Sequence, residues 1–127
     1  RKGLSCDVIF LGYVTVAQLR VLYHQTEVFV FPSLYEGFGF PIVEAFACGA
    51  AVVASNTSSC AEVAGDAALT VAPDQPQDIA AAMSRIMEDP SLKASLKAKG
   101  LERADQFSFD TTARRTLEVY QEAAHVR

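Results

Sequence analysis

Two glutamates, Glu36 and Glu44, stand eight positions apart around a glycine-rich segment, and this part of the chain is best suited to chemistry. The segment contains Gly37 and Gly39 and leads to Pro41. Glycine lets the backbone approach a ligand closely, and proline is favoured near the first position of a helix. Because an apolar run comes before it, the pattern predicts a buried strand, a tight turn and a helix N-terminus.

This arrangement predicts a binding site for a phosphate group between two carboxylates. Backbone N–H groups at a helix N-terminus lack partners within the helix, and the helix dipole helps them to bind anions. A carboxylate can accept two hydrogen bonds at once, which suits two neighbouring hydroxyl groups. Phosphate flanked by hydroxyl groups is the chemistry of a nucleotide sugar. Alternatively, Glu44 only complements the helix dipole and Glu36 is an ordinary loop residue.

The elements that must position these residues predict an α/β protein. Short and largely apolar runs are expected to form four strands, at residues 8–12, 27–31, 51–55 and 68–72. The runs do not alternate with polar residues and each precedes a helical pattern, as in a parallel sheet covered on both faces. The sequence therefore predicts a Rossmann-like, three-layer fold, in which ligands bind at the carboxyl ends of strands. The glycine turn lies at such an end, as do residues 12–14 and 55–58.

Helical spacing of apolar residues predicts six helices between and after these strands. They are expected at residues 15–25 with Thr15 as the N-cap, 41–48 before Gly49, 58–64 before Gly65, and in three segments after residues 73–74, the second of which starts at residues 89–90. The last of them begins near Ser108. Its apolar stripe, which includes Leu117 and Tyr120, is expected to pack in the core.

Composition places the chain among ordinary soluble proteins. It has 127 residues, enough for one domain or part of one, and a formal net charge of −4. This charge argues against a nucleic-acid partner, which usually requires a basic surface. Cys6, Cys48 and Cys60 lack the spacing of a zinc site, so reduced thiols are expected. There is no apolar run of about eighteen residues and no secretory signal pattern, so a cytoplasmic location is expected.

The segment from Glu36 to Glu44 resembles the E-x7-E signature of the retaining GT-B glycosyltransferases of family 4. The resemblance extends over nearly the whole chain, through residues 8–14, 22–33, 49–55, 62–68 and the closing helices. It implies that residues 1–127 correspond to the later part of a C-terminal, nucleotide-sugar-binding domain, which is half of a GT-B fold. The first strands of that domain and the N-terminal acceptor domain would then be absent from this sequence.

The resemblance also implies a role for each matching residue. Glu36 would contact hydroxyl groups of the donor sugar, as a positioning group rather than a nucleophile. Glu44 would hold the ribose hydroxyls, and main-chain groups at Tyr13 and Val14 would meet the base. The implied catalytic residue is Glu36, and the implied donor-binding residues are Tyr13, Val14, Gly37, Phe38, Gly39, Phe40, Pro41, Ile42, Val43 and Glu44.

The implied reaction moves a sugar from a UDP-sugar or GDP-sugar donor to an acceptor, with retention of the anomeric configuration and without a metal or other cofactor. Family members carry an Arg and a Lys that neutralise the diphosphate, in a part of the domain that would precede this sequence. Arg1 and Lys2 are not expected to replace them. This piece alone is therefore expected to bind the donor without catalysing transfer.

Other interpretations of the sequence remain open. The chain could be a non-catalytic sugar-nucleotide-binding or regulatory module, or an epimerase on the same two-domain plan. A receiver-like module would need an acidic cluster, for which Asp7 alone is insufficient. A sheet edge exposed at residues 8–11 would favour a homodimer, and association with the inner membrane surface through the absent domain is a further hypothesis.

Overall fold

Three parallel strands form the centre of the protein, in a computed structural model that describes residues 7–125. They are β1 (Phe29–Phe31), β2 (Val52–Ser55) and β3 (Ala68–Val71), and they lie side by side in the order β1-β2-β3. Val52 of the central strand is in register with Phe29 on one side and with Ala68 on the other. All four residues of β2 are buried, as expected for a strand covered on both faces.

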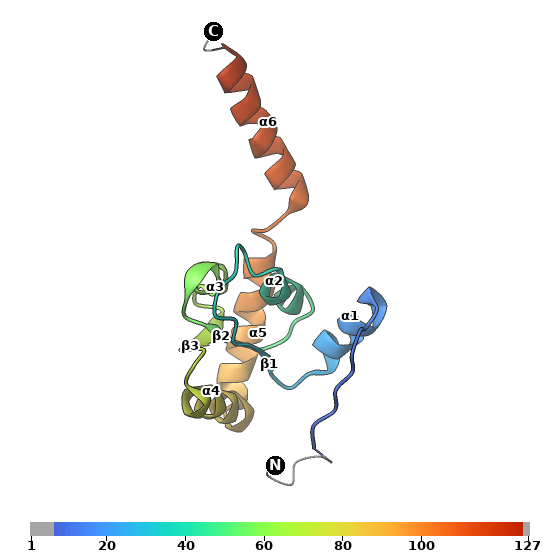
Figure 1. The fold of residues 1–127 in the computed structure, drawn as a ribbon, viewed down its shortest axis with the longest axis vertical. Helices are drawn as coiled ribbons and strands as arrows, with labels where there is room; N and C mark the ends of the chain where they lie inside the picture. Colours follow the sequence, from blue (N-terminus) through green and yellow to red (C-terminus); the bar gives the residue numbers. More distant parts are fainter. Residues whose placement is uncertain (1–6, 126–127) are drawn as a thin grey trace.

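Helices cover both faces of this sheet (Figure 1). The helices of the described chain are α1 (Val16–Gln25), α2 (Phe40–Ala47), α3 (Ser58–Ala64), α4 (Pro76–Glu88), α5 (Pro90–Ala104) and α6 (Phe109–His125), and all but α6 pack around the sheet. Side chains of β2 alternate between two core clusters. Val52 and Ala54 join a cluster with residues of α1, α2 and α3, whereas Val53 joins one with residues of α4 and α5. The predicted three-layer, Rossmann-like α/β fold is therefore confirmed.

The strand expected at residues 8–12 does not form, so the described sheet has three strands rather than four. Ile9 and Phe10 are 79% and 93% exposed. A strand is stable only when a neighbour accepts and donates its backbone hydrogen bonds, and within residues 7–125 this segment pairs with none. A homodimer edge at residues 8–11 would require these residues to become a strand first. Arg1 and Lys2 lie outside the described residues.

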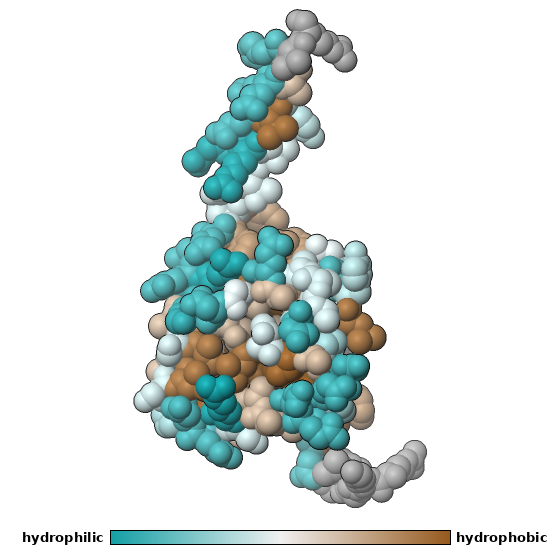
Figure 2. Space-filling model, turned by 90° about the vertical axis from the view of Figure 1, so that its left-hand side faces the viewer, coloured by the Kyte–Doolittle hydropathy of each residue, from teal (hydrophilic) through white to brown (hydrophobic). Residues whose placement is uncertain are grey.

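Helix α6 extends away from the rest of the protein (Figure 1), and none of its residues is buried. Leu117 is 55% exposed and Tyr120 is 69% exposed, so the expectation that this apolar stripe packs in the core is wrong. The helix forms, but no other element of the described chain faces its stripe. Figure 2 shows mainly hydrophilic side chains on α6 with one apolar patch, and a broader apolar area low on the body.

Helix α5 packs closely against α2. A Cβ atom at Gly100 of α5 would lie only 2.8 Å from Cδ1 of Phe46, which is fully buried on α2. A glycine at this position therefore lets the two helices approach more closely than any other residue would allow. The contact fixes α2, the helix predicted to begin at the phosphate site.

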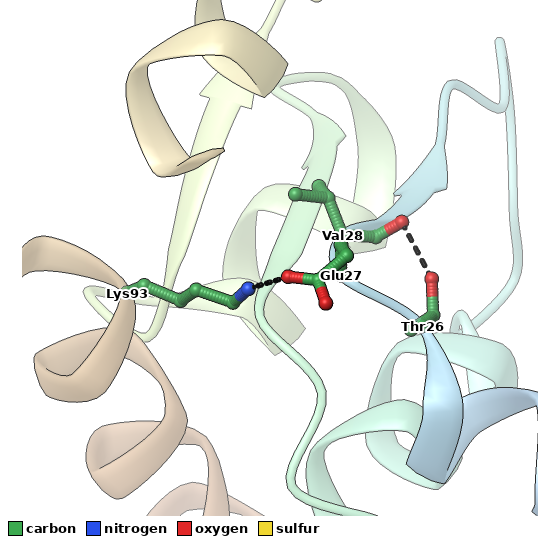
Figure 3. A network of polar contacts seen from close by, with 4 residues as sticks. All are labelled: Thr26, Glu27, Val28 and Lys93. Atoms are coloured by element: carbon green, nitrogen blue, oxygen red, sulfur yellow. Dashed lines mark hydrogen bonds and ion pairs between the residues drawn. The ribbon is translucent and has the colours of Figure 1, made fainter. Parts of the chain in front are cut away.

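A second contact from α5 reaches the chain just before β1 (Figure 3). Lys93 forms an ion pair with Glu27 and lowers the pKa of that carboxyl, chiefly through their hydrogen bond. Beside it, the Thr26 hydroxyl donates to the Val28 carbonyl at 2.9 Å. These contacts fix the path by which the chain leaves α1 and enters β1.

Candidate functional site

The turn between β1 and α2 brings the chain sharply from the sheet into a helix. Gly39 is the N-cap of α2 and has φ 98°, a left-handed conformation that favours glycine. A Cβ atom there would lie 3.4 Å from Cδ1 of Ile42 and 3.7 Å from Sγ of Cys60. Gly37, in contrast, does not have a positive φ, and a Cβ atom there would meet no atom within 4 Å. Only Gly39 is therefore required by the geometry of the turn.

Four consecutive backbone amides of this turn are available for a ligand. Within the described chain, the N–H groups of residues 37–40 donate no hydrogen bond, and no side chain caps α2. Pro41 has no N–H, and the Ile42 N–H donates to the Gly39 carbonyl at 3.0 Å. The Ile42 amide is therefore not free, because the first turn of the helix already uses it. The free donors lie before Pro41.

Glu36 is fixed at its backbone by two serines at the start of α3. The Ser58 hydroxyl accepts from the Glu36 N–H at 3.0 Å and donates to the Glu36 carbonyl at 2.7 Å. The Ser59 hydroxyl donates to the same carbonyl at 2.8 Å. The Glu36 side chain is half-buried, and its Oε1 accepts from the Ser33 hydroxyl at 2.8 Å. The carboxyl ends of β1 and β2 thus meet at Glu36.

Ser58 has φ 54° and is the one non-glycine residue with a positive φ in the described chain. Such a conformation costs about 1–2 kcal/mol for a residue with a side chain. The three hydrogen bonds that its hydroxyl makes, to both backbone groups of Glu36 and from the Ser59 N–H, offset this cost. Sequence reasoning placed residues 55–58 at a strand end but assigned no role to Ser58 or Ser59.

Glu44 lies on α2 with an exposed side chain, and its Oε2 accepts a hydrogen bond of 3.2 Å from the Tyr23 hydroxyl of α1. Tyr23 is buried, with 6% of its surface exposed. Burial, and then the charge and hydrogen bond of Glu44, raise the pKa of Tyr23 to about 12. Tyr23 therefore keeps its proton at neutral pH. The helix predicted at residues 15–25 contains this tyrosine, but the local pattern does not predict its contact with Glu44.

A cavity of about 690 Å³ lies between α2 and the beginning of α6. From the turn and α2, its lining includes Phe38, Phe40, Val43 and Glu44. Rings of Phe38 and Phe40 lie 4.8 Å apart between centroids. The structure thus brings these four predicted donor-binding residues together, whereas the described lining of this cavity does not include Glu36. The two glutamates face different surroundings.

Tyr13 and Val14 lie just before α1, away from this cavity. Tyr13 is 94% exposed, and Val14 lines a separate, shallow groove beside α1. A capping box fixes the start of the helix: the Gln18 N–H donates to the Thr15 hydroxyl, and the Gln18 side chain accepts from the Thr15 N–H. The structure does not bring the loop at Tyr13 and Val14 into the cavity that Glu44 lines.

Residues 7–125 contain no group of three or more His, Cys, Asp or Glu side chains placed to hold a metal ion. In the same range, no helix has both the length and the apolar character needed to cross a membrane. Cys48 and Cys60 are free thiols.

Residues 1–103 match the family model described as "Glycosyl transferases group 1". The chain belongs to this family. Among solved structures, this glycosyl transferase chain is similar to sucrose-phosphate synthase from Thermosynechococcus elongatus, with a TM-score of 0.87 and 31% identity over 98% of the chain. The fold is therefore that of a Rossmann-like half of a GT-B enzyme.

The relatives of this chain include proteins named as mannosyltransferases, two of which follow. O-antigen chain mannosyltransferase B of Escherichia coli is 42% identical over 112 residues, or 88% of this chain. MMP alpha-(1→4)-mannosyltransferase of Mycolicibacterium hassiacum is 36% identical over 125 residues, or 95% of it. The chain spans 29% and 30% of the length of these two relatives and 32% of the synthase chain.

Proposed function

We propose that this group 1 glycosyl transferase chain binds the nucleotide-sugar donor of a retaining glycosyltransferase. The observation that carries the proposal is the row of free amides at residues 37–40 between two glutamates that are held in place. Ser58 holds the backbone of Glu36, and Tyr23 holds the carboxylate of Glu44. Amides before a helix N-terminus, aided by the helix dipole, suit a diphosphate. The carboxylates suit the hydroxyl groups on either side of it.

Each part of the site then has one role. Amides of residues 37–40 bind the diphosphate, Glu44 accepts hydrogen bonds from the ribose hydroxyls, and Glu36 accepts them from the transferred sugar. The loop at Tyr13 and Val14 approaches the base. This assignment agrees with the separate surroundings of the two glutamates, because sugar and ribose lie at opposite ends of the diphosphate.

In this proposal, catalysis consists mainly of stabilising the departing diphosphate. Negative charge develops on its oxygen as the bond to the sugar breaks, and donors that already point there lower the barrier. Glu36 positions the sugar and forms no covalent bond to it. The amides, together with cationic side chains from elsewhere in the enzyme, neutralise this charge without a metal ion. Since the chain spans about a third of its relatives, we expect it to be inactive alone.

The names of the two relatives favour mannose as the transferred sugar. A decisive experiment is calorimetric titration of the full-length protein with UDP, GDP and ADP, followed by GDP-mannose and a UDP-sugar. We expect one nucleoside diphosphate to bind below millimolar concentration. If none of the three does, the proposed function is wrong.

The roles of the carboxylates are tested by comparing Glu44→Ala with Glu36→Ala. We expect Glu44→Ala to weaken the binding of the free nucleotide by about tenfold or more, because one or two charge-assisted hydrogen bonds are lost. Glu36→Ala should leave the affinity for the free nucleotide unchanged and lower only the affinity for the sugar-bearing donor. Equal effects of the two substitutions on both ligands would show that the roles are assigned wrongly.

A further inference from the structure

Tyr23 is the residue of α1 that reaches most deeply into the protein, and it ends on Glu44. Its side chain is 6% exposed, and its hydroxyl lies 3.2 Å from Glu44 Oε2, across 21 positions of sequence. None of the roles assigned above uses it. The question is whether this contact only joins α1 to α2 or also prepares Glu44 for a ligand.

The Tyr23 ring is held firmly by its surroundings. It packs edge-on against Phe29 of β1, with ring centroids 5.0 Å apart and an angle of 88° between the planes. It also belongs to the same core cluster as Ile42 and Phe46 of α2. The hydroxyl is therefore placed by a rigid aromatic ring in a packed core rather than by a flexible chain.

Glu44, in contrast, has an exposed and flexible side chain that would otherwise sample several rotamers. Tyr23 holds only one carboxylate oxygen. Within the described residues, the other oxygen, Oε1, accepts no hydrogen bond, and a carboxylate has acceptor capacity on both oxygens. The hydrogen bond therefore reduces the freedom of the carboxylate and leaves an oxygen available for a hydroxyl group of a ligand.

The Tyr23 hydroxyl keeps its proton at neutral pH and can therefore donate a hydrogen bond to Glu44. Its pKa is raised to about 12, first by burial and then by the negative charge of Glu44 and their hydrogen bond. The same helix starts at the capping box of Thr15, directly after the loop at Tyr13 and Val14. Tyr23 thus links Glu44 to the helix that carries the loop proposed to meet the base.

We propose that Tyr23 is a positioning residue for ribose recognition, because its hydroxyl fixes the Glu44 carboxylate so that the free oxygen receives the ribose hydroxyls. This inference rests on the proposed function, since it assumes that a nucleotide occupies the site. It predicts that Tyr23 matters for the ribose hydroxyls and for no other part of the nucleotide.

The test compares two ligands in the full-length protein: the nucleoside diphosphate that binds the wild type most tightly and its 2′,3′-dideoxy counterpart. Tyr23→Phe keeps the ring and removes only the hydroxyl. We expect this substitution to weaken binding of the ribonucleotide by about fivefold, because one supporting hydrogen bond is lost. Binding of the dideoxynucleotide should change by less than about twofold. Tyr120→Phe, which removes an exposed hydroxyl on α6, should change neither ligand.

A double substitution tests whether Tyr23 acts through Glu44. We expect Tyr23→Phe to cause no further loss once Glu44 is alanine. The inference is overturned if Tyr23→Phe weakens the binding of both ligands equally or of neither. It is also overturned if the loss of affinity caused by Tyr23→Phe adds to that caused by Glu44→Ala. In both cases the proposed function survives. If the wild type binds UDP, GDP and ADP only above millimolar concentration, the proposed function fails and this inference fails with it.

Discussion

The two glutamates of the turn are held in opposite ways. At Glu36 the backbone is fixed from outside, by hydroxyl groups of Ser58 and Ser59 that bind its N–H and carbonyl groups. At Glu44 the backbone belongs to α2, and the side chain is fixed by the buried Tyr23. Glu36 therefore depends on the start of α3, whereas Glu44 depends on α1.

This difference shows how one short segment can serve two ends of a ligand. Within the described chain, the backbone groups of Glu36 have no backbone partner, and the serines of α3 satisfy them instead. A helix supplies them already, and only the end of the long side chain needs support. Damage to α3 should therefore affect the sugar end of the site, and damage to α1 should affect the ribose end.

The largest loss of stability should come from a substitution of Gly39, which lies between Glu36 and Glu44. Gly39→Val places a β-branched residue at φ 98° and crowds Ile42 and Cys60, so we expect a loss of about 4 kcal/mol in the free energy of unfolding. Urea-induced unfolding measures it.

Gly37→Val is the matched control for this substitution. Because Gly37 does not have a positive φ and a Cβ atom there meets nothing within 4 Å, we expect a loss below about 1 kcal/mol. Similar losses for the two glycines would mean that Gly39 does not determine the turn. If Gly37→Val nevertheless weakens donor binding, the amides at this position contact the ligand.

The next largest effect is the pH dependence of the free energy of unfolding that Tyr23, the partner of Glu44, contributes. Tyr23 has a pKa of about 12 in the folded protein, above the ordinary value of 10, so folding strengthens its hold on the proton. This stabilisation is complete below pH 10 and is lost as the pH rises through 12. A shift of this size corresponds to about 2–3 kcal/mol.

The measurement is urea-induced unfolding of wild type and Tyr23→Phe between pH 9 and pH 12. The free energy of unfolding of the wild type should fall more steeply with pH over this interval than that of Tyr23→Phe. Parallel curves would show that the Tyr23 hydroxyl is not buried against Glu44.

Most elements of the fold could be predicted because their signals are local. Thr15 forms the expected capping box, and Gly49 and Gly65 follow their helices with positive φ values. The continuous apolar run of β2 reflects burial on both faces of the sheet, as predicted, whereas β1 and β3 at the edges are buried only in part. These signals need no knowledge of distant contacts.

The wrong predictions depend on contacts that a local pattern does not specify. Residues 8–12 have the composition of a strand, but strand formation needs a partner, and the described chain provides none. The stripe of α6 is amphipathic, but the pattern does not say which surface it should cover.

The same limit applies to the site. Glu36, Gly39 and Glu44 stand close together in sequence, so their spacing could be recognised. Tyr23 and Ser58 lie 21 and 22 positions from their glutamates, and only the fold brings them into contact.

At the Glu36 end, Ser58→Ala removes a hydroxyl that forms three hydrogen bonds and keeps a side chain at φ 54°. We expect it to lower the free energy of unfolding by about 1–2 kcal/mol and to weaken the sugar-bearing donor more than the free nucleotide. Ser58→Gly should cost less, because glycine adopts this conformation easily. A stronger effect of Ser58→Ala on the free nucleotide would contradict the division between the two ends.

The smallest effect should come from Ser33, which contacts the Glu36 side chain but not its backbone amide. Its hydroxyl lies 2.8 Å from Glu36 Oε1, and the Ser58 and Ser59 contacts remain when it is removed. Ser33→Ala should therefore lower the free energy of unfolding by less than about 1 kcal/mol and weaken the sugar-bearing donor about twofold, with Ser33→Thr close to wild type. Calorimetric titration of the three proteins measures this. A loss as large as that of Ser58→Ala would mean that the Glu36 side chain, and not its backbone, is the part that must be fixed.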